Sequence, residues 1–548
     1  MPDQRFARHE RVFMLRLINL NVPLDYTESS LRSLLLKKLK LTSDQLLDFR
    51  ISRRSIDARD RQDVHFVLSV DLTLRNETAA LHKSKNLSRI RSQPQNDSSL
   101  FVAHHCSSCR RPLVVGAGPA GLFAALTLAR AGMDPVLIER GKPVHARIRD
   151  VSTLQESGIL NPDSNVQFGE GGAGAFSDGK LTCGIKSPYV RSILETFVAH
   201  GAPEEILIDQ KPHIGTDRLR GVVTSIREEI IRLGGTVLFE TRLEEMILRG
   251  GHVEGAVLSR SGERIEFLTD AVLLCIGHSA RDTIQALFGQ GLRMVQKPFA
   301  MGVRIEHLRA FIDRSQYGSF AGHPALGAAS YKLVCHTKDG RGVYTFCMCP
   351  GGTVIAAASQ PGGVVTNGMS FHARDGLNSN AALLVGVRPE DFGDEHPLAG
   401  IVLQRGIEKA AFRSGGGGFV APAQRVGDFL ENRASVSFGE VIPSYRPGVI
   451  PADLRAVLPA WITEDLKTGI RAMNAQLAGF ADPDAVLTGP ETRSSSPVRI
   501  CRNALGEADD IRGLWPVGEG AGYAGGIVSA AADGITAALK AIEKQRLL

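Results

Sequence analysis

The chain has 548 residues, several times the length of a single-core domain, so its length predicts two or three domains. Hydrophobic residues make up 43% and charged residues 22%, which is ordinary for a globular protein and excludes a mainly disordered chain. Eight cysteines in this length exclude a disulfide scaffold. We read neither a secretory signal nor a membrane span, and therefore expect a cytoplasmic protein.

The net charge of +6 is concentrated at the N-terminus, where residues 1–110 carry 19 Lys and Arg against 12 Asp and Glu. Alternating residues predict strands at 12–17 and 64–70, and leucines at helical spacing predict a helix over 29–39. The following residues 83–110 are polar and aperiodic, which indicates a linker. This basic unit could contact nucleic acid, but no aromatic or GXXG signature of RNA binding accompanies it. A solvated positive face or a docking domain is therefore the preferred interpretation.

A complete strand–turn–helix–strand unit begins at residue 111. A short apolar strand at 113–115 leads into the turn GAGPAG at 116–121, an Ala- and Leu-rich helix over 122–131, and a second strand over 136–138. A GxGxxG turn in this context is typical of a dinucleotide-binding fold. The alternative, a simple tight connection between strand and helix, leaves the other elements unexplained.

Five residues of this turn are predicted to serve cofactor binding or packing. Gly116 permits the tight turn, and Gly118 lets the backbone approach a pyrophosphate at the helix N-terminus. Pro119 and Ala120, in the same turn, are also predicted to contact the cofactor. Gly121 lets the helix pack closely against the strand.

Glu139 ends the second strand, 18 residues after Gly121. At this position a carboxylate can accept hydrogen bonds from the ribose hydroxyls, and it repels a 2′-phosphate, so an NADP-type dinucleotide is excluded. Arg140, the next residue, could cover the adenine or pair with the pyrophosphate. It could equally be a solvated cation at the end of a strand.

The C-terminal segment favours FAD over NAD. A strand at 514–517 leads into the loop 518–527, and an Ala-rich helix over 526–543 follows. The loop contains a second formal GxGxxG, but only 23 residues follow its last glycine, Gly525, which is too few for a second nucleotide domain.

That segment can instead return to the first domain. Gly518 and Glu519 would then hold a ribityl chain. Gly526 and Ile527 would begin a helix beneath the flavin pyrimidine, where negative charge develops on reduction. NAD has no ribityl chain, so the predicted cofactor is FAD.

Two stretches, 111–141 and 514–534, resemble the FAD signatures of glutathione-reductase-type flavoproteins. More specifically, the chain from about residue 111 onward resembles a family of FAD-dependent dehydrogenases of uncertain substrate, the NAD(FAD)-utilising dehydrogenases. The closer match is carried by NVQFGEGGAGAFSDGKL (165–181), FCMCPGG (346–352), SSPVR (495–499) and GEGAGYAGG (518–526). The resemblance implies an FAD domain assembled from separated segments around an inserted substrate domain. It also implies oxidoreductase activity, and it supplies no substrate.

The glycine-rich loop 169–181 is predicted to form a second wall of the flavin site. Its four closely spaced glycines allow a close backbone approach, and its free N–H groups can serve the pyrophosphate or the flavin edge. A surface loop is the alternative. The contacts predicted from this loop are Gly172, Gly174, Ser177 and Asp178, with Lys180 as a further charge near the flavin. Elsewhere, Leu243 is predicted to contact adenine, and Gly277 closes a strand and turn at 271–277.

No motif in the sequence identifies a catalytic residue, and four residues are candidates. Cys347 and Cys349 could form a dithiol that relays electrons, although alternating cysteines on one strand face are more simply core residues. Lys180 would lie near the flavin, and Arg493 could anchor a substrate carboxylate. A zinc site within His104–Cys109 lacks a second ligand pair, so no metal is expected.

Together these patterns predict an α/β fold with a discontinuous Rossmann-like FAD domain and an inserted mixed or antiparallel sheet. The predicted divisions are a small basic α/β domain at 1–82, a linker at 83–110, FAD-binding segments at 111–297 and 486–548, and the inserted substrate domain at 298–485.

The predicted function is an FAD-dependent dehydrogenase or reductase that transfers a hydride between a small substrate and non-covalently bound FAD. Any NAD(P)H would bind transiently, since only one dinucleotide domain is readable. One alternative is a flavin-dependent monooxygenase, against which Glu519 stands where hydroxylases have Asp. Another is an RNA-modifying or RNA-binding flavoprotein that uses residues 1–110, and a third is a purely structural role for the flavin. The oligomeric state is not readable.

Overall fold

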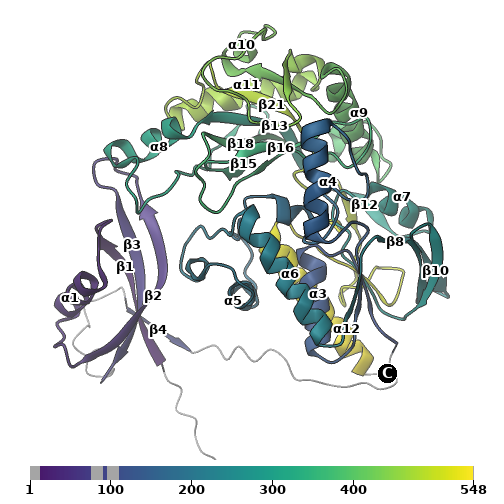
Figure 1. The fold of residues 1–548 in the computed structure, drawn as a ribbon, viewed down its shortest axis with the longest axis horizontal. Coiled ribbons are helices and arrows are strands. Elements are labelled where there is room, and N and C mark those ends of the chain that lie inside the picture. The colour runs from purple at the N-terminus through teal and green to yellow at the C-terminus, as the bar shows by residue number, and fades with distance from the viewer. Residues whose placement is uncertain (1–12, 76–89, 95–109, 547–548) are drawn as a thin grey trace, which may run out of the picture. The chain divides into compact units, whose positions relative to one another are not determined.

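The computed structural model describes residues 13–75, 90–94 and 110–546, which divide between two compact units (Figure 1). The smaller unit holds the described residues up to 94, with 204–212 and 317–327. The larger unit holds the rest. The sequence His104–Cys109, considered above for zinc, lies outside the described residues.

The smaller unit contains an antiparallel sheet in the order β2-β3-β1-β4 and one long helix. Its elements are β1 (Phe13–Val22), α1 (Glu28–Leu39), β2 (Leu46–Asp57), β3 (His65–Leu74), β4 (Ile90–Pro94), η2 (Glu204–Leu207) and η3 (Gly318–Phe320). The helix begins at a capping box on Thr27 and buries Leu31, Leu35 and Leu39, as the leucine spacing predicted. Strand β4 lies within the predicted linker. Polar side chains gave no alternation there, and its pairing with β1 makes the strand.

The larger unit is built first on a parallel sheet in the order β23-β11-β5-β6-β7. Its strands are β5 (Leu113–Val115), β6 (Val136–Ile138), β7 (Thr236–Leu238), β11 (Val272–Leu274) and β23 (Leu514–Pro516). The helices of this part are α3 (Pro119–Arg130), α4 (Val144–Ser157), α5 (Val190–Ala199), α6 (Thr216–Arg232), α7 (Arg281–Gly289) and α12 (Ile527–Arg546), with the short η1 (Gly172–Phe176). The sheet therefore combines strands from both predicted FAD segments.

The last helix, α12, packs along α3 (Figure 1). The contact is close because Gly534 lies against the backbone of Ala120: a Cβ added to Gly534 would stand 2.1 Å from the Ala120 carbonyl oxygen. The C-terminal segment thus returns to the first strand–turn–helix unit, as the sequence predicted.

A three-stranded antiparallel sheet, β8 (Thr241–Arg249), β9 (His252–Arg260) and β10 (Glu263–Leu268), follows β7. Both residues of the turn Ser261-Gly262 have positive φ, as a tight hairpin requires. Strand β8 was not predicted from the sequence. Its buried residues Thr241, Leu243 and Met246 do not alternate strictly, because the register with β9 shifts between Leu243 and Glu245.

The inserted part carries a seven-stranded sheet in the order β14-β15-β18-β13-β21-β19-β20, which we call the inserted sheet. Its strands are β13 (Phe299–Leu308), β14 (Val334–His336), β15 (Gly342–Cys349), β18 (Asn378–Val387), β19 (Ala421–Arg425), β20 (Val449–Pro451) and β21 (Val486–Glu491). The helices of this part are α8 (Arg309–Tyr317), α9 (Ala399–Ser414), α10 (Val426–Leu430) and α11 (Ala460–Gln476), with the short η4 (Pro389–Phe392) and η5 (Leu454–Ala456). Two separate antiparallel pairs are β16 (Thr353–Ala356) with β17 (Thr366–Met369), and β12 (Met294–Gln296) with β22 (Val498–Ile500). Parallel and antiparallel sheets in one mixed α/β chain confirm the predicted fold class. Among the described residues no helix is long and apolar enough to span a bilayer.

Candidate functional site

One cavity of about 310 Å³ lies within the larger unit, at the carboxyl ends of the parallel strands. Val115 and Ile138 end β5 and β6, Cys275 follows β11 and Val517 follows β23, and all four line the cavity. The carboxyl edge of a parallel sheet is where open α/β folds bind ligands. Phe346, Asn367 and Glu491, from or near the inserted sheet, complete the opposite wall.

Most residues predicted for the site line this one cavity. They are Gly116, Gly118, Pro119, Ala120, Glu139, Arg140, Gly172, Gly174, Ser177, Asp178, Leu243, Gly277, Glu519, Gly526 and Ile527, together with the catalytic candidates Lys180, Cys347 and Arg493. Three others, Gly121, Gly518 and Cys349, do not line it. Gly518 donates its N–H to Asp533 at 2.7 Å. The structure thus brings together segments that are hundreds of residues apart in the sequence.

The glycine turn has the geometry that its sequence predicts. Gly116 has φ +102°, and a Cβ added to Gly121 would stand only 1.8 Å from the Gly116 carbonyl oxygen. Gly118 occupies the N-cap position of α3, and no side chain among the described residues caps that helix. The first N–H groups of α3 are therefore available to an anion in the cavity.

Glu139 is buried and accepts three backbone hydrogen bonds. Its Oε2 accepts from Ala117 N at 2.8 Å, and its Oε1 accepts from Gly141 N and Gly169 N, each at 2.9 Å. The carboxylate therefore ties the glycine turn to the second glycine-rich loop, a role that the sequence did not reveal. Its contact with a ribose stays a prediction, and its position on the cavity wall is compatible with it.

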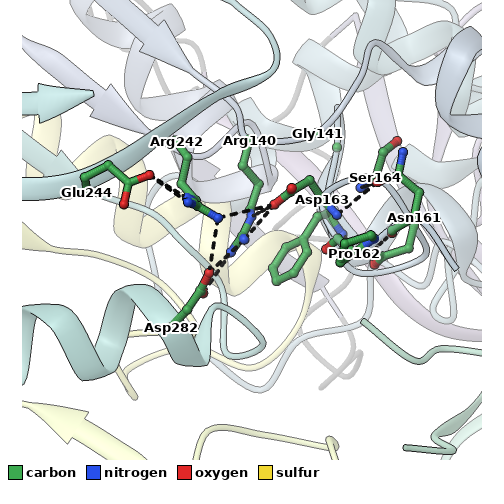
Figure 2. Close-up of polar contacts among 12 residues, drawn as sticks. Arg140, Gly141, Asn161, Pro162, Asp163, Ser164, Arg242, Glu244 and Asp282 are labelled. Atoms are coloured by element: carbon green, nitrogen blue, oxygen red, sulfur yellow. Dashed lines mark hydrogen bonds and ion pairs between the residues drawn. The ribbon is translucent and has the colours of Figure 1, made fainter. Parts of the chain in front are cut away.

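Arg140 lines the cavity and lies in a cluster of charged side chains with Asp163, Arg242, Glu244 and Asp282, which we call the rim cluster (Figure 2). It bonds to Asp163 and to Asp282, each at 2.8 Å, and its guanidinium stacks 4.3 Å from the centre of the Phe168 ring. Arg242 pairs with Glu244 at 2.7 Å and lies within 4 Å of the same two aspartates. Arg140 is thus already paired, and the phosphate contact considered for it would compete with two carboxylates.

Asp178 also lines the cavity, where it lies among cations. It pairs with Lys180 at 3.0 Å and with Arg374 at 2.5 Å, and it accepts a hydrogen bond from Ser370. Burial opposes its ionisation, but Lys180 and Arg374 outweigh burial and hold the pKa of Asp178 well below its ordinary value. The carboxylate is therefore ionised and shared between two cations.

A second buried carboxylate, Glu408 on α9, also holds two cations. It bonds to Arg281 at 2.8 Å through both oxygens and to Arg493 at 3.0 and 3.1 Å. All three side chains are at most 3% exposed. Despite burial, the two arginines hold the pKa of Glu408 below its ordinary value. Arg493, predicted to anchor a substrate, is thus positioned by Glu408 on the cavity wall.

The two candidate cysteines are separated by a bulge in β15. The register with β18 shifts between Phe346 and Cys349, and Cys347 takes a left-handed conformation with φ +43°. Strict alternation would place both thiols on one face, but here Cys347 lines the cavity and Cys349 is buried behind it. Burial raises the pKa of both thiols, to about 11 for Cys349.

Several polar residues of the site were not predicted from the sequence: His278, Arg304, Asn367, Arg374, Glu408 and Glu491. For two of them, the sequence contains a sign that could have been used: a charged residue within an apolar strand. Arg304 interrupts the apolar run of β13, and Glu491 ends the buried strand β21. A charge inside a buried strand needs a partner, which marks both residues for attention. Among the described residues, no group of three or more His, Cys, Asp or Glu side chains could hold a metal ion.

Three parts of the chain match known family models. Residues 298–494 match a family model described as "FAD-dependent protein, C-terminal domain-like", and residues 111–157 match an "FAD binding domain". Residues 14–73 match a domain of unknown function. An uncharacterised protein of Clostridium beijerinckii is 47% identical over 539 residues, which cover 97% of this chain and 99% of that protein. The chain belongs to a family of FAD-dependent flavoproteins.

Solved structures similar to this flavoprotein share little of its sequence. A geranylgeranyl bacteriochlorophyll reductase-like protein from Thermoplasma acidophilum is 12% identical, covers 79% of each chain and gives a TM-score of 0.34. Quinol fumarate reductase FrdA from E. coli is also 12% identical, covers 80% of this chain and 70% of its own, and gives 0.35. Scores this low support no conclusion about the reaction.

The cavity residues fit FAD, the cofactor of this family. The uncapped N-terminus of α3 suits a pyrophosphate. His278 Nε2 is buried and has no hydrogen-bond partner among the described residues, while its Nδ1 lies 3.6 Å from Glu519. Because both side chains line the cavity, they offer polar partners to the hydroxyls of a ribityl chain.

Proposed function

We propose that this flavoprotein is a dehydrogenase or reductase that transfers a hydride between a small substrate and non-covalently bound FAD. One observation carries the proposal: a single cavity is lined both by the dinucleotide-binding turn and by polar residues of the inserted sheet. Such a cavity can hold the cofactor at one end and a second molecule at the other. We keep the domain divisions predicted from the sequence as part of this proposal.

FAD, when bound, supplies the two-electron chemistry, accepting or giving a hydride at its N5 atom. The chain's own residues divide the remaining tasks by position. Gly118 and the start of α3 bind phosphate, and Glu519 with His278 orients the ribityl chain. The buried apolar strands around them exclude water from the flavin.

The far end of the cavity is assigned to the substrate. Lys180 and Arg493 line it, and each belongs to a cluster in which two cations surround one carboxylate. Both clusters therefore carry surplus positive charge that favours an anionic group on the substrate. Because burial raises the pKa of Cys347, that residue stays a neutral thiol near pH 7, which argues against a thiolate nucleophile.

The test begins with the purified protein and its absorption spectrum. We expect the yellow bands of a bound flavin, and their bleaching under anaerobic conditions by NADH, NADPH or a dithiol identifies the class of electron donor. A panel of small hydroxy and amino acids then tests the substrate. A colourless protein that stays empty in excess FAD would overturn the proposal. Incorporation of oxygen into a product would favour the monooxygenase alternative.

A further inference from the structure

A buried ion pair lies directly behind the substrate end of the cavity. Arg304 on β13 is fully buried, and its Nε lies 2.6 Å from Oε2 of Glu491 at the end of β21. Glu491 is only 4% exposed, yet it also lines the cavity. A charged pair in this position is expensive to bury, so its presence calls for a function beyond stability.

Arg304 uses its three nitrogens on three different residues that all line the cavity. Nε pairs with Glu491, one terminal nitrogen donates to the Cys347 carbonyl at 3.0 Å, and the other donates to Asn367 Oδ1 at 3.1 Å. A Cβ on Gly368 would stand 2.7 Å from the guanidinium, so a larger residue there would displace it. The guanidinium therefore fixes one wall of the cavity from behind.

The backbone that Arg304 holds at Cys347 is unusual. A non-glycine residue in the left-handed region costs energy and persists only where its surroundings impose it. Here the bulge in β15 and the hydrogen bond from Arg304 to the Cys347 carbonyl impose it. The same guanidinium thus positions both Glu491 and the bulge beside it.

Two opposing effects set the pKa of Glu491. Burial raises the pKa of Glu491 to about 7, although Arg304 on β13 favours the charged form. Ionisable groups near it in the cavity lining include Lys180 and Asp178 from the glycine-rich loop, Cys347 from β15, and Arg493 two residues further along the chain. The same cavity is also lined by the ionisable residues Glu139, Arg140, Arg242, Cys275, His278 and Glu519. A carboxyl group of this kind can both accept and return a proton at physiological pH.

We propose that Glu491 is the catalytic proton-transfer residue of the substrate end and that Arg304 is its positioning residue. This inference rests on the proposed function. When a substrate carbon bearing a hydroxyl or amino group is oxidised, its C–H hydrogen leaves with the electron pair as the hydride. The O–H or N–H bond also breaks, its proton bonds to a carboxylate oxygen of Glu491, and a C=O or C=N bond forms. In the reverse direction, Glu491 returns the proton.

Redox-induced infrared difference spectroscopy of the holoprotein tests this role without a known substrate. The bound flavin is reduced with dithionite at about pH 8, where Glu491 is mostly ionised. Reduction adds negative charge to the cavity, so Glu491 takes up a proton from solvent and the C=O stretch of a carboxylic acid appears. We expect this band in the wild type and in Glu263→Gln, an exposed control on β10, but not in Glu491→Gln.

The infrared band has outcomes that support or overturn the role of Glu491. A band that persists in Glu491→Gln, or a wild-type flavin that bleaches without any such band, overturns the role of Glu491. If Glu491→Gln fails to retain FAD, the wild type alone remains decisive. Its band must fade when reduction is carried out at about pH 5.5, where Glu491 is already protonated. A protein whose flavin is absent or cannot be reduced instead refutes the proposed function, which separates the two failures.

Discussion

The two ends of the cavity are built by different means. At the dinucleotide end, the wall consists of glycines, a helix N-terminus and the carboxylate of Glu139, which accepts three backbone N–H groups. At the substrate end, the carboxylates Asp178, Glu408 and Glu491 are buried and pair with arginine or lysine. In the proposed function, the first end binds the cofactor through the backbone, and the second presents charged side chains to the substrate.

This difference has an energetic consequence. Hydrogen bonds between a carboxylate and backbone N–H groups stabilise the turn without burying an uncompensated cation. Buried ion pairs contribute little net stability but become costly when one partner is removed. Substitutions at the substrate end should therefore cost more stability than those at the rim cluster of the dinucleotide end.

The largest effect is expected for Glu408→Gln. The substitution leaves Arg281 and Arg493, both nearly inaccessible to solvent, without their shared carboxylate. We expect a loss of about 3–5 kcal/mol in the free energy of unfolding, measured by urea denaturation. Glu263→Gln on the exposed face of β10 is the control and should change little. A loss below about 1 kcal/mol would contradict the view that this triad is tightly coupled.

The next effect concerns pH and Glu491. Because its folded pKa is raised, the protonated form stabilises the fold, and that stabilisation is lost as pH rises through about 7. Relative to Glu491→Gln, the wild type should lose about 3 kcal/mol of stability between its unfolded and folded pKa values. Thermal melts of both proteins from acid to neutral pH measure this difference. If the melting temperatures of the two proteins change with pH in the same way, Glu491 does not titrate in this range.

Two glycines of the turn should behave differently. In Gly121→Ala the new Cβ would meet the Gly116 carbonyl oxygen at 1.8 Å, which should cost about 1–3 kcal/mol and much of the bound FAD. In Gly118→Ala the nearest atom is 3.8 Å away, so the fold should persist while a pyrophosphate approaches less closely. Melting temperature and flavin content after gel filtration separate the two outcomes. Equal melting temperatures would contradict the packing role of Gly121.

The smallest effect is expected at the rim. Asp163→Asn removes a carboxylate that is 49% exposed, and Asp282 remains to pair with Arg140. The loss should be below about 1 kcal/mol and should shrink further in high salt. Thermal melts at two salt concentrations check this. A loss as large as that of Glu408→Gln would erase the contrast between the two ends.

The contrast between the two ends also explains how far the sequence could be interpreted. The glycine turn, the second strand that ends at Glu139, and the C-terminal helix all follow from neighbouring residues, because turn and helix conformation depend on local residue types. The FAD prediction rests on these segments and is confirmed by the family match.

What the sequence by itself determined is therefore the mixed α/β fold and the dinucleotide end of the cavity. Only the tertiary structure decided the substrate end. Arg374 lies 196 residues from Asp178, and Arg281 lies 127 residues from Glu408. The sequence around a charged residue does not show whether that residue is solvated or paired with a distant partner. Folding of the inserted sheet against the dinucleotide domain buries these charges together, and burial makes each of them depend on its distant partner.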